Sequence, residues 1–482
     1  MEDQFLYEQI AARFEQQVSE GVLSPGDKLP SVRMLSREQG VSLSTAYKVY
    51  VELENKGLIE ARTRSGYFVR KRYQETRQSL PCQVMLPDTT PVNVDEMIAT
   101  VFRHIPNEHM IRLSQALPSA ELMPVAKLNK SMMESLRKST SGNGHYEVLQ
   151  GNIALRRQIA KHSINWGCAI VPDDIVTTHG CMEALIFCLR ALTKPGDTVA
   201  IDSPTYFGIF NVMLSLDLKV LEIPVHPTDG LDIGYLEQVM ETTAIKACLF
   251  VPSFNNPTGA LLSDTRKQQL VELLRTREIP LIEDDIYGDL YFGRKRPLSC
   301  KAFDTEGLVL LCSSVSKSLA PGYRVGWCIP GRFKEEVLRM KRMHTVSSAT
   351  PTQAAVANFF ETGRYDLHLR KLRKMLHMQC LHYTEATANS FPPGTIITAP
   401  QGGYVLWIEL DAGIDAFSLF RMAMEKDISI APGQVFSTDG RFSNFIRISF
   451  GAPLTTEIRN SIQILGDLVR DYNTMALIQK SP

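Results

Sequence analysis

Apolar positions in the first 60 residues recur at helical spacing and predict three short helices. The first helix ends at Gly21, and its apolar face is formed at intervals of four residues by Leu6, Ile10, Phe14 and Val18. Ser31 is placed to cap a second helix, because serine hydroxyls accept the backbone N–H groups left free at a helix start. A third helix, capped by Ser42 or Ser44, extends to Lys56.

Two short apolar-rich runs follow the third helix and predict a β-hairpin. They are residues 58–61 and 67–69, and Gly66 lies in the intervening turn. Three small helices and a hairpin form a winged helix-turn-helix, whose third helix can enter the major groove of DNA. Arg62 and Arg64 lie at the hairpin tip, in a stretch from 61 to 72 that holds five basic residues and no acidic one. Such a wing suits contacts with DNA phosphates.

The overall charge implies no polyanionic partner for the chain as a whole, since 52 basic side chains balance 52 acidic ones. Residues 1–72 carry 11 basic and 10 acidic side chains, so periodicity leaves a dimerisation module as the alternative to DNA binding. The nine cysteines include no C-x-x-C pair, which argues against a metal site and favours the reducing cytoplasm. The acidic start lacks the order of a signal peptide, and no apolar run is long enough for a membrane span.

From about residue 110 onward, apolar strand-like runs alternate with helical stretches. The runs lie at 175–178, 198–201, 247–251, 281–284 and 308–312. This alternation predicts a parallel sheet covered by helices, with ligands bound at the carboxyl ends of its strands. Residues 71–108 lack periodicity and contain several prolines, so we expect a linker there.

Lys317 lies in a stretch that combines hydroxyl groups with an arginine. Ser314 and Ser316 precede the lysine, and Arg324 follows it by seven residues. A lysine amine can form a Schiff base with pyridoxal phosphate, while hydroxyls and a guanidinium hold the phosphate. The stretch therefore predicts a pyridoxal phosphate site.

Polar residues at other predicted strand ends suit the cofactor ring. Asp284 closes a strand and can pair with the ring nitrogen. Tyr287 follows three residues later and Asn256 follows another strand, and both can donate hydrogen bonds to the ring oxygen. Taken singly, these are also common strand-end residues, and Asn256 precedes a proline as in an ordinary turn.

Residues at helix and loop positions suit the phosphate and the face of the ring. Gly180, Cys181 and Met182 open a helix directly after a strand, where free N–H groups bind phosphate. The Cys181 side chain is interpreted as a small packing residue, with a reactive thiol as the alternative. Tyr206 can stack on the ring, and Tyr146 can reach a phosphate from outside the sheet domain.

Arg447 lies in an alternating strand near the end of the chain. An arginine in such a strand usually belongs to a solvated face. The functional alternative is a bidentate clamp for the α-carboxylate of an amino acid.

The strings at residues 21–33, 40–45 and 53–59 resemble the GntR-type winged helix, over nearly all of residues 5–69. The resemblance implies DNA contacts from the second and third helices and the wing, made by Arg33, Ser44, Thr45, Lys48, Arg62, Arg64 and Gly66.

The body resembles the fold type I aminotransferases over about residues 110–475, because its motifs occur in that family's order. The resemblance implies that Lys317 forms the internal aldimine and, with Asp284 and Tyr287, is catalytic. It also implies that Asn256 and Tyr287 hold the ring oxygen. Ser314 and Arg324 would take the phosphate, which leaves Ser316 as an adjacent hydroxyl only.

A GntR-type head on an aminotransferase-like body resembles the MocR subfamily of bacterial regulators, over essentially the whole chain. The resemblance implies an α/β protein with a DNA-binding domain at 1–70, a linker at 71–108 and a cofactor-binding domain at 109–482. Its large domain would span about residues 150–345, with a small domain from the flanking segments. It also implies a homodimer in which Tyr146 serves the phosphate of the neighbouring subunit.

The predicted function is a transcriptional regulator that binds operator DNA and senses pyridoxal phosphate or a small amino-compound effector. The first alternative is a functional aminotransferase with an accessory head, since the catalytic set is complete. The second is a sensor of the cofactor alone. Arg447 favours an amino-acid-like ligand, and the intact caps, turn and basic wing of the head favour regulation.

Overall fold

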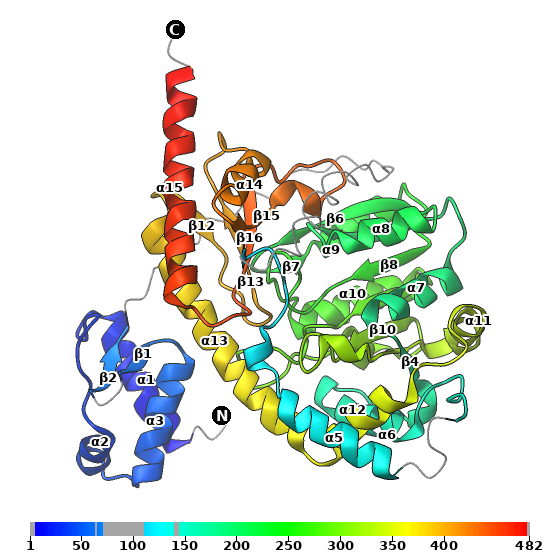
Figure 1. The fold of residues 1–482 in the computed structure, drawn as a ribbon, viewed down its shortest axis with the longest axis horizontal. Helices are drawn as coiled ribbons and strands as arrows, with labels where there is room; N and C mark the ends of the chain where they lie inside the picture. The colour runs from blue at the N-terminus through cyan, green and yellow to red at the C-terminus, as the bar shows by residue number, and fades with distance from the viewer. Residues whose placement is uncertain (1–4, 63–64, 71–109, 139–143, 480–482) are drawn as a thin grey trace. The chain divides into compact units, whose positions relative to one another are not determined.

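The computed structural model describes residues 5–62, 65–70, 110–138 and 144–479, which belong to two compact units (Figure 1). We call the described residues up to 70 the head and those from 110 onward the body. The predicted linker at 71–108 lies outside the described residues, so the expected domain bounds stay predictions.

The head has three helices and a hairpin, as its apolar pattern predicts, in the order α1 (Leu6–Ser19), α2 (Val32–Glu38), α3 (Leu43–Asn55), β1 (Ile59–Arg62) and β2 (Gly66–Val69). The Ser31 hydroxyl accepts the backbone N–H of Met34 at the start of α2 (3.2 Å). The Ser42 hydroxyl accepts that of Thr45 (3.0 Å), so Ser42 rather than Ser44 caps α3. Each cap satisfies a backbone donor that the helix start would otherwise leave free.

One apolar core joins the helices and the hairpin of the head. Ile10 of α1, Leu35 of α2 and Val49 of α3 are buried in it. The Tyr50 ring stacks on Tyr67 of β2, with the ring centroids 4.5 Å apart. Because Val49 and Tyr50 hold one side of α3 in this core, the opposite side of the helix faces solvent.

The body is built around an eight-stranded sheet, with strands in the spatial order β4 (Val176–Thr178), β11 (Gly326–Ile329), β10 (Val309–Ser314), β9 (Leu281–Asp284), β8 (Ala247–Phe250), β5 (Thr198–Ser203), β6 (Lys219–His226) and β7 (Gly230–Leu231). The strands from β10 to β6 run parallel, as expected. β11 is antiparallel to β4 and β10, and β7 is antiparallel to β6. β11 departs from the expected direction because residues 315–325 return the chain directly beside β10.

Helices cover both faces of this sheet (Figure 1). One face carries α7 (Cys181–Leu192), α8 (Gly208–Ser215) and α11 (Lys334–His344), and the other carries α9 (Ile233–Met240) and α10 (Asp264–Thr276). Within β5, Val199 and Ile201 pack with the first layer, whereas Ala200 packs with the second. Since side chains alternate along a strand, burial on both faces requires the continuous apolar runs seen in the sequence.

A second, antiparallel sheet lies in the C-terminal part of the body, in the order β12 (Ile396–Ile397), β13 (Val405–Glu409), β16 (Phe445–Ser449) and β15 (Ala431–Pro432). The helices of this region are α13 (Arg364–Ser390), α14 (Ala416–Met424) and α15 (Thr456–Gln479). The first strand of the body, β3 (Ile111–Arg112), pairs with β14 (Ile428–Ser429). Segments far apart in the sequence therefore meet beside this sheet.

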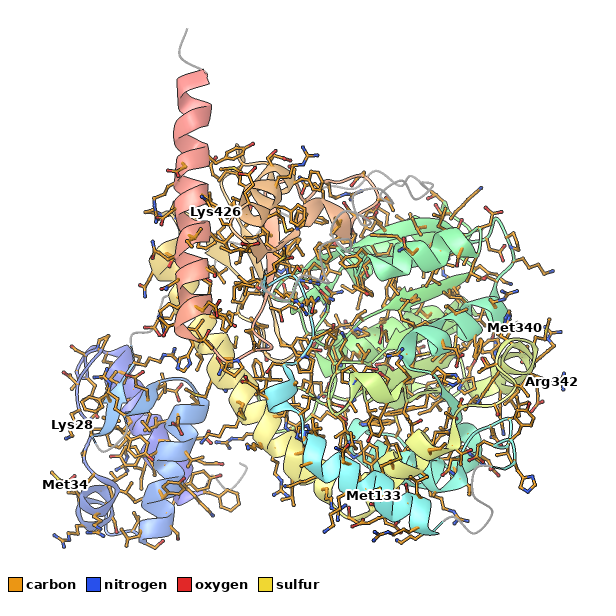
Figure 2. All side chains as sticks on the ribbon, in the orientation of Figure 1. Lys28, Met34, Met133, Met340, Arg342 and Lys426 are labelled. Atoms are coloured by element: carbon orange, nitrogen blue, oxygen red, sulfur yellow. The ribbon has the colours of Figure 1, made fainter. Side chains whose placement is uncertain are left out.

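Three further helices, α5 (Val125–Lys138), α6 (Ile153–His162) and α12 (Thr350–Glu361), pack on one another. Side chains fill the space between the layers of the body, and Met133 of α5 points outward (Figure 2). In the described part of the chain, no helix combines the length and the apolar character that crossing a membrane requires.

Candidate functional site

The helices of the head present the predicted DNA-contact residues on the surface. Ser44 and Lys48 are exposed on the side of α3 that faces away from the core, and Thr45 is half-buried beside them. Arg33 is exposed in the first turn of α2. The cap of α3 orders this surface further, because the Ser42 hydroxyl lies 2.9 Å from that of Ser44.

The wing holds its arginine in place without burying it. Arg62 pairs with Glu60 (2.7 Å), and its guanidinium lies 4.4 Å from the centre of the Phe68 ring. An exposed ion pair of this kind contributes about 1 kcal/mol at most, so a DNA phosphate can compete for the guanidinium. Gly66 has φ of 105°, a backbone conformation that favours glycine. Arg64 lies outside the described residues.

The body contains a cavity of about 310 Å³ at the carboxyl ends of the strands of the large sheet. The structure brings nine of the predicted site residues together on its wall, namely Cys181, Met182, Tyr206, Asn256, Asp284, Tyr287, Lys317, Arg324 and Arg447. Their convergence follows from the topology, because the ends of neighbouring parallel strands meet at one edge of a sheet.

Lys317 reaches the cavity from the connection between β10 and β11. Its ammonium group donates a hydrogen bond to the backbone carbonyl of Ala116 (2.7 Å). Burial, together with the nearby charge of Arg447, lowers the pKa of Lys317 to about 8. The neutral, nucleophilic form of this amine is therefore far more populated near neutral pH than in an ordinary lysine.

Asp284 lies at the end of β9, next to β10. Its carboxylate accepts the thiol of Cys181 (3.3 Å) and the backbone N–H of Ile286 (3.2 Å). Burial raises the pKa of Asp284 to about 6, while the Cys181 hydrogen bond acts in the opposite direction. The carboxylate is thus mostly ionised at neutral pH, and a cationic ring nitrogen beside it would favour the charged form further.

Asn256 and Tyr287 form a neutral donor pair in the cavity wall. The Asn256 amide donates to the Tyr287 hydroxyl at 3.4 Å. Burial raises the pKa of Tyr287 well above its ordinary value, so the phenol keeps its proton. Tyr206 also lines the cavity, and burial raises its pKa as well.

The start of α7 lies against Arg324 and forms an anion cradle. The Arg324 guanidinium donates to the backbone carbonyl of His179 (3.0 Å) and to the Ser316 hydroxyl (3.3 Å). Gly180 precedes α7 with φ of 85°, and a Cβ there would lie 2.4 Å from a guanidinium nitrogen of Arg324. A glycine at this position therefore permits the arginine to approach the free N–H groups of the helix start.

The two serines before Lys317 differ in their placement. Ser316, which sequence analysis regards as an adjacent hydroxyl, lies on the cavity wall and contacts Arg324. The Ser314 hydroxyl accepts the backbone N–H of Ser316 (3.2 Å), and Ser314 is not among the described residues of the wall. The roles of both serines toward a phosphate stay predictions.

Arg447 of β16 is almost fully buried, with 1% of its surface exposed. It donates to the Asn256 side-chain oxygen (2.9 Å) and to the backbone carbonyl of Ser114. Its Nε has no hydrogen-bond partner among the described residues, and burial lowers its pKa to about 10. The solvated strand face considered for this residue is therefore wrong. A buried guanidinium without a carboxylate partner in the described chain fits an anionic ligand.

Tyr146 does not reach the cavity of its own chain. Its side chain is 87% exposed, and it is not among the described residues of the wall. Sequence analysis missed the segment from Ser114 to Leu117, which lines the cavity and carries the carbonyls that Lys317 and Arg447 contact. These contacts involve main-chain atoms, so the side-chain pattern of this segment contains no signal for them.

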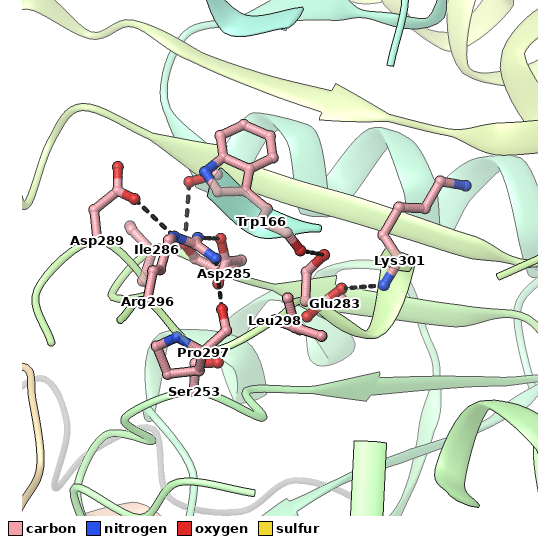
Figure 3. Close-up of polar contacts among 12 residues, drawn as sticks. Trp166, Ser253, Glu283, Asp285, Ile286, Asp289, Arg296, Pro297, Leu298 and Lys301 are labelled. Carbon is pink, nitrogen blue, oxygen red and sulfur yellow. Dashed lines mark hydrogen bonds and ion pairs between the residues drawn. The ribbon is translucent and has the colours of Figure 1, made fainter. Parts of the chain in front are cut away.

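Glu283 and Asp285, the neighbours of Asp284 in the chain, belong to a buried polar network (Figure 3). Asp285 pairs with Arg296, and the Nε of Arg296 donates to Asp289 (2.7 Å). Glu283 accepts the backbone N–H groups of Cys300 and Lys301. Removing one partner of a buried pair typically costs about 3–5 kcal/mol, so this network fixes the strand end that carries Asp284.

Comparisons with known proteins agree with the two parts of this structure. Residues 6–69 match the bacterial regulatory proteins of the gntR family, and residues 108–462 match aminotransferase class I and II. The chain belongs to the class I and II aminotransferase family in its body and carries a GntR-type head. Together these make it a member of the helix-turn-helix transcriptional regulators that have an aminotransferase-like domain.

Individual relatives share this arrangement over nearly their whole length. The uncharacterized HTH-type transcriptional regulator YjiR of Escherichia coli (strain K12) is 35% identical, over 96% of this chain and 98% of its own. YdcR of the same organism, also named as such a regulator, is 34% identical over 96% and 99%. The body is similar to a Pyrococcus horikoshii kynurenine aminotransferase solved with PMP, with 26% identity, a TM-score of 0.72 and coverage of 78% and 94%.

Proposed function

We propose that this chain is a MocR-type regulator that binds operator DNA through its head and pyridoxal phosphate, or an amino compound together with it, through its body. The observation that carries the proposal is that one chain combines an exposed α3 surface with a cavity on whose wall Lys317, Asp284, Tyr287, Asn256 and Arg324 meet.

The residues of the cavity fit pyridoxal phosphate. When bound, the cofactor supplies an aldehyde for an amine and a pyridine ring that withdraws electrons. Lys317 supplies the amine, Asp284 the partner of the ring nitrogen, and Asn256 with Tyr287 the donors for the ring oxygen. Arg324 and the start of α7 hold the phosphate, with Ser314 and Ser316 nearby.

Arg447 would hold the α-carboxylate of an amino-acid-like effector. Ligand binding is coupled to DNA binding if the ligand binds one arrangement of the protein more tightly than another. A coupling free energy of about 1–3 kcal/mol is enough. A ligand of this kind changes the affinity for DNA by the same factor by which DNA changes the affinity for the ligand.

A functional aminotransferase with an accessory head is the second candidate, and the complete set of Lys317, Asp284 and Tyr287 favours it. Amino-group transfer between amino acids and keto acids, measured on the full-length protein with cofactor, tests this candidate. Turnover at rates typical of enzymes, about 1 s⁻¹ or more, would support it.

The assembled protein is proposed to be a cytoplasmic homodimer in which Tyr146 serves the neighbouring subunit. The motif around Tyr146 predicts a contact with a phosphate, but the Tyr146 side chain is 87% exposed in its own chain. This exposure supports a role in the neighbouring subunit. We expect analytical ultracentrifugation to show a dimer. A monomer that retains full cofactor affinity would contradict this role for Tyr146.

DNA binding that depends on the cofactor is the main expected result for the regulator. Fluorescence anisotropy would follow the full-length protein on its upstream intergenic DNA, with and without pyridoxal phosphate, over a salt series. Arg33→Ala should weaken specific binding by about 1–3 kcal/mol because it removes a groove or phosphate contact. Arg13→Ala, an exposed arginine of α1, is the matched control and should leave binding unchanged.

Two results of this experiment would count against the proposal. Binding that is weak, equally strong on unrelated DNA and insensitive to cofactor would favour the aminotransferase. An unchanged DNA affinity of Arg33→Ala would instead contradict the assignment of the contact surface on the head.

A further inference from the structure

Basic side chains concentrate on one part of the body, although the chain as a whole is neutral. A cleft of about 540 Å³ lies between α13 and the loop that follows β9, and its wall includes Arg294, Lys295, Arg370 and Arg373. Lys371, the residue after Arg370 in α13, is also exposed. With Lys127 of α5, these residues form what we call the basic strip.

The two acidic side chains of this cleft, Asp289 and Asp366, are outnumbered by its basic side chains. Asp289 is turned inward, where its carboxylate is held by Arg296 (2.7 Å), His162 (3.2 Å) and the Tyr365 hydroxyl (3.1 Å). Asp366 is largely exposed, and the Nε of Arg370 donates to its backbone carbonyl (3.4 Å). Among the described residues, the exposed Lys295, Arg370 and Lys371 have no acidic side chain within ion-pair distance.

The strip continues from α13 onto α5. Arg364 of α13 donates to the Ser131 hydroxyl (2.8 Å) and pairs with Glu134 (3.3 Å), which joins the two helices. The two helices lie close together in Figure 1. Lys127 of α5 and Lys371 of α13 both lie near His368. Burial is the main reason that the pKa of His368 is lowered, and the charges of the two lysines lower it further.

The strip is also held rigidly. Arg373 stacks on the Tyr291 ring, with 4.2 Å between the guanidinium carbon and the ring centre, and donates to the backbone carbonyl of Asp289 (3.3 Å). Arg370 and Lys371 are also carried by α13, a helix of 27 residues that packs on the body with its apolar side, whereas Lys127 lies on α5. A surface on which basic side chains outnumber acidic ones attracts a polyanion.

We propose that the basic strip contacts the phosphate backbone of DNA that flanks the operator bound by the head. This inference rests on the proposed function, which supplies the DNA. A row of lysines and arginines on a rigid helix suits duplex DNA, because phosphates recur along it and are read without regard to sequence. The contacts raise affinity and fix where the body lies on the flank, while the head selects the sequence.

The experiment compares two duplexes, a minimal operator and the same operator extended by arbitrary flanking sequence. The full-length protein with cofactor would be titrated with each duplex over a salt series. The variant carries Lys295→Gln, Arg370→Gln and Lys371→Gln, which remove charge but keep a polar, flexible side chain. The control variant carries Lys194→Gln, Lys219→Gln and Lys246→Gln. These three lysines are exposed and lie at or near the amino ends of β5, β6 and β8.

For wild type and control variant we expect the longer duplex to bind more tightly and with a steeper dependence on salt. The slope of log K against log salt should be steeper by about 0.9 for each added phosphate contact, or about 2.7 for three. The basic-strip variant should lose this increment and bind the minimal operator as wild type does.

Several results would overturn the inference. One is an equal slope for the basic-strip and control variants on the longer duplex. Another is an equal loss of affinity for both duplexes in the basic-strip variant, which would mean that the substitutions act on the head or on folding. Failure of wild type to bind the minimal operator would contradict the proposed function itself.

Discussion

Replacement of Lys317 by alanine should abolish covalent retention of pyridoxal phosphate while the protein stays folded. The side chain ends in the cavity, and its only hydrogen bond within the described chain is to a backbone carbonyl, so truncation breaks no hydrogen bond between side chains. Asp284 loses the nearby positive charge, which raises the pKa of its carboxyl and favours the neutral form. Borohydride reduction of the loaded protein, followed by peptide mass spectrometry, should find the cofactor on the peptide with Lys317 in wild type and nowhere in the variant. Lys426→Ala, at an exposed lysine (Figure 2), is the control.

The pH dependence of cofactor attachment gives a second readout for this residue. Only the neutral amine is nucleophilic, and the pKa of Lys317 is lowered to about 8 by burial and by Arg447. The rate of attachment should therefore rise with pH through about 8 and level off above it. A rise that continues to about 10.4, the ordinary lysine value, would show that the amine is not buried as described. Cofactor found on a different lysine would contradict the assignment outright.

Arg447→Met should weaken binding of α-amino acids by about 30-fold or more, with little change in cofactor binding. Loss of a buried, charge-assisted carboxylate contact typically costs about 2–5 kcal/mol. Methionine restores much of the volume, and exchange of a buried charge for an apolar side chain is often tolerated. The measurement is a titration of cofactor-loaded protein with a panel of amino acids, followed by the absorption of the bound cofactor.

A ligand control separates the clamp from general damage to the site. Primary amines that lack the carboxylate should bind wild type and Arg447→Met with similar affinity, because they make no contact with the guanidinium. An equal loss for amino acids and for such amines would show that the substitution disturbs the cavity as a whole. An unchanged affinity for amino acids would remove Arg447 from the effector site.

Local patterns were sufficient for much of this protein. The spacing of Leu6, Ile10 and Phe14 and the Ser31 cap determine helices of the head, because these features depend on neighbours within one or two turns. The apolar runs of the body likewise predict strands, since a strand buried on both faces needs apolar residues at successive positions. The motif around Lys317 indicates the cofactor before any strand order is known.

Other features depend on contacts between distant segments. The direction of β11 follows from the return of the chain after Lys317, which no periodicity records. The path of the connection between β10 and β11 decides that Ser316, and not Ser314, lies on the cavity wall. The Ser114 and Ala116 carbonyls are main-chain groups, so their role beside Arg447 and Lys317 leaves no trace in side-chain types.

The sequence by itself predicted the two-part plan, a pyridoxal phosphate site and most of the residues that meet in the cavity, because each rests on a short motif or a local period. Only the tertiary structure decided that Arg447 is buried without a carboxylate and that Cys181 donates to Asp284. It also showed that basic residues of α13 and of the loop after β9 line one cleft. Burial, charge balance and proximity between distant segments are properties of the packed chain, and they arise when the layers close on one another.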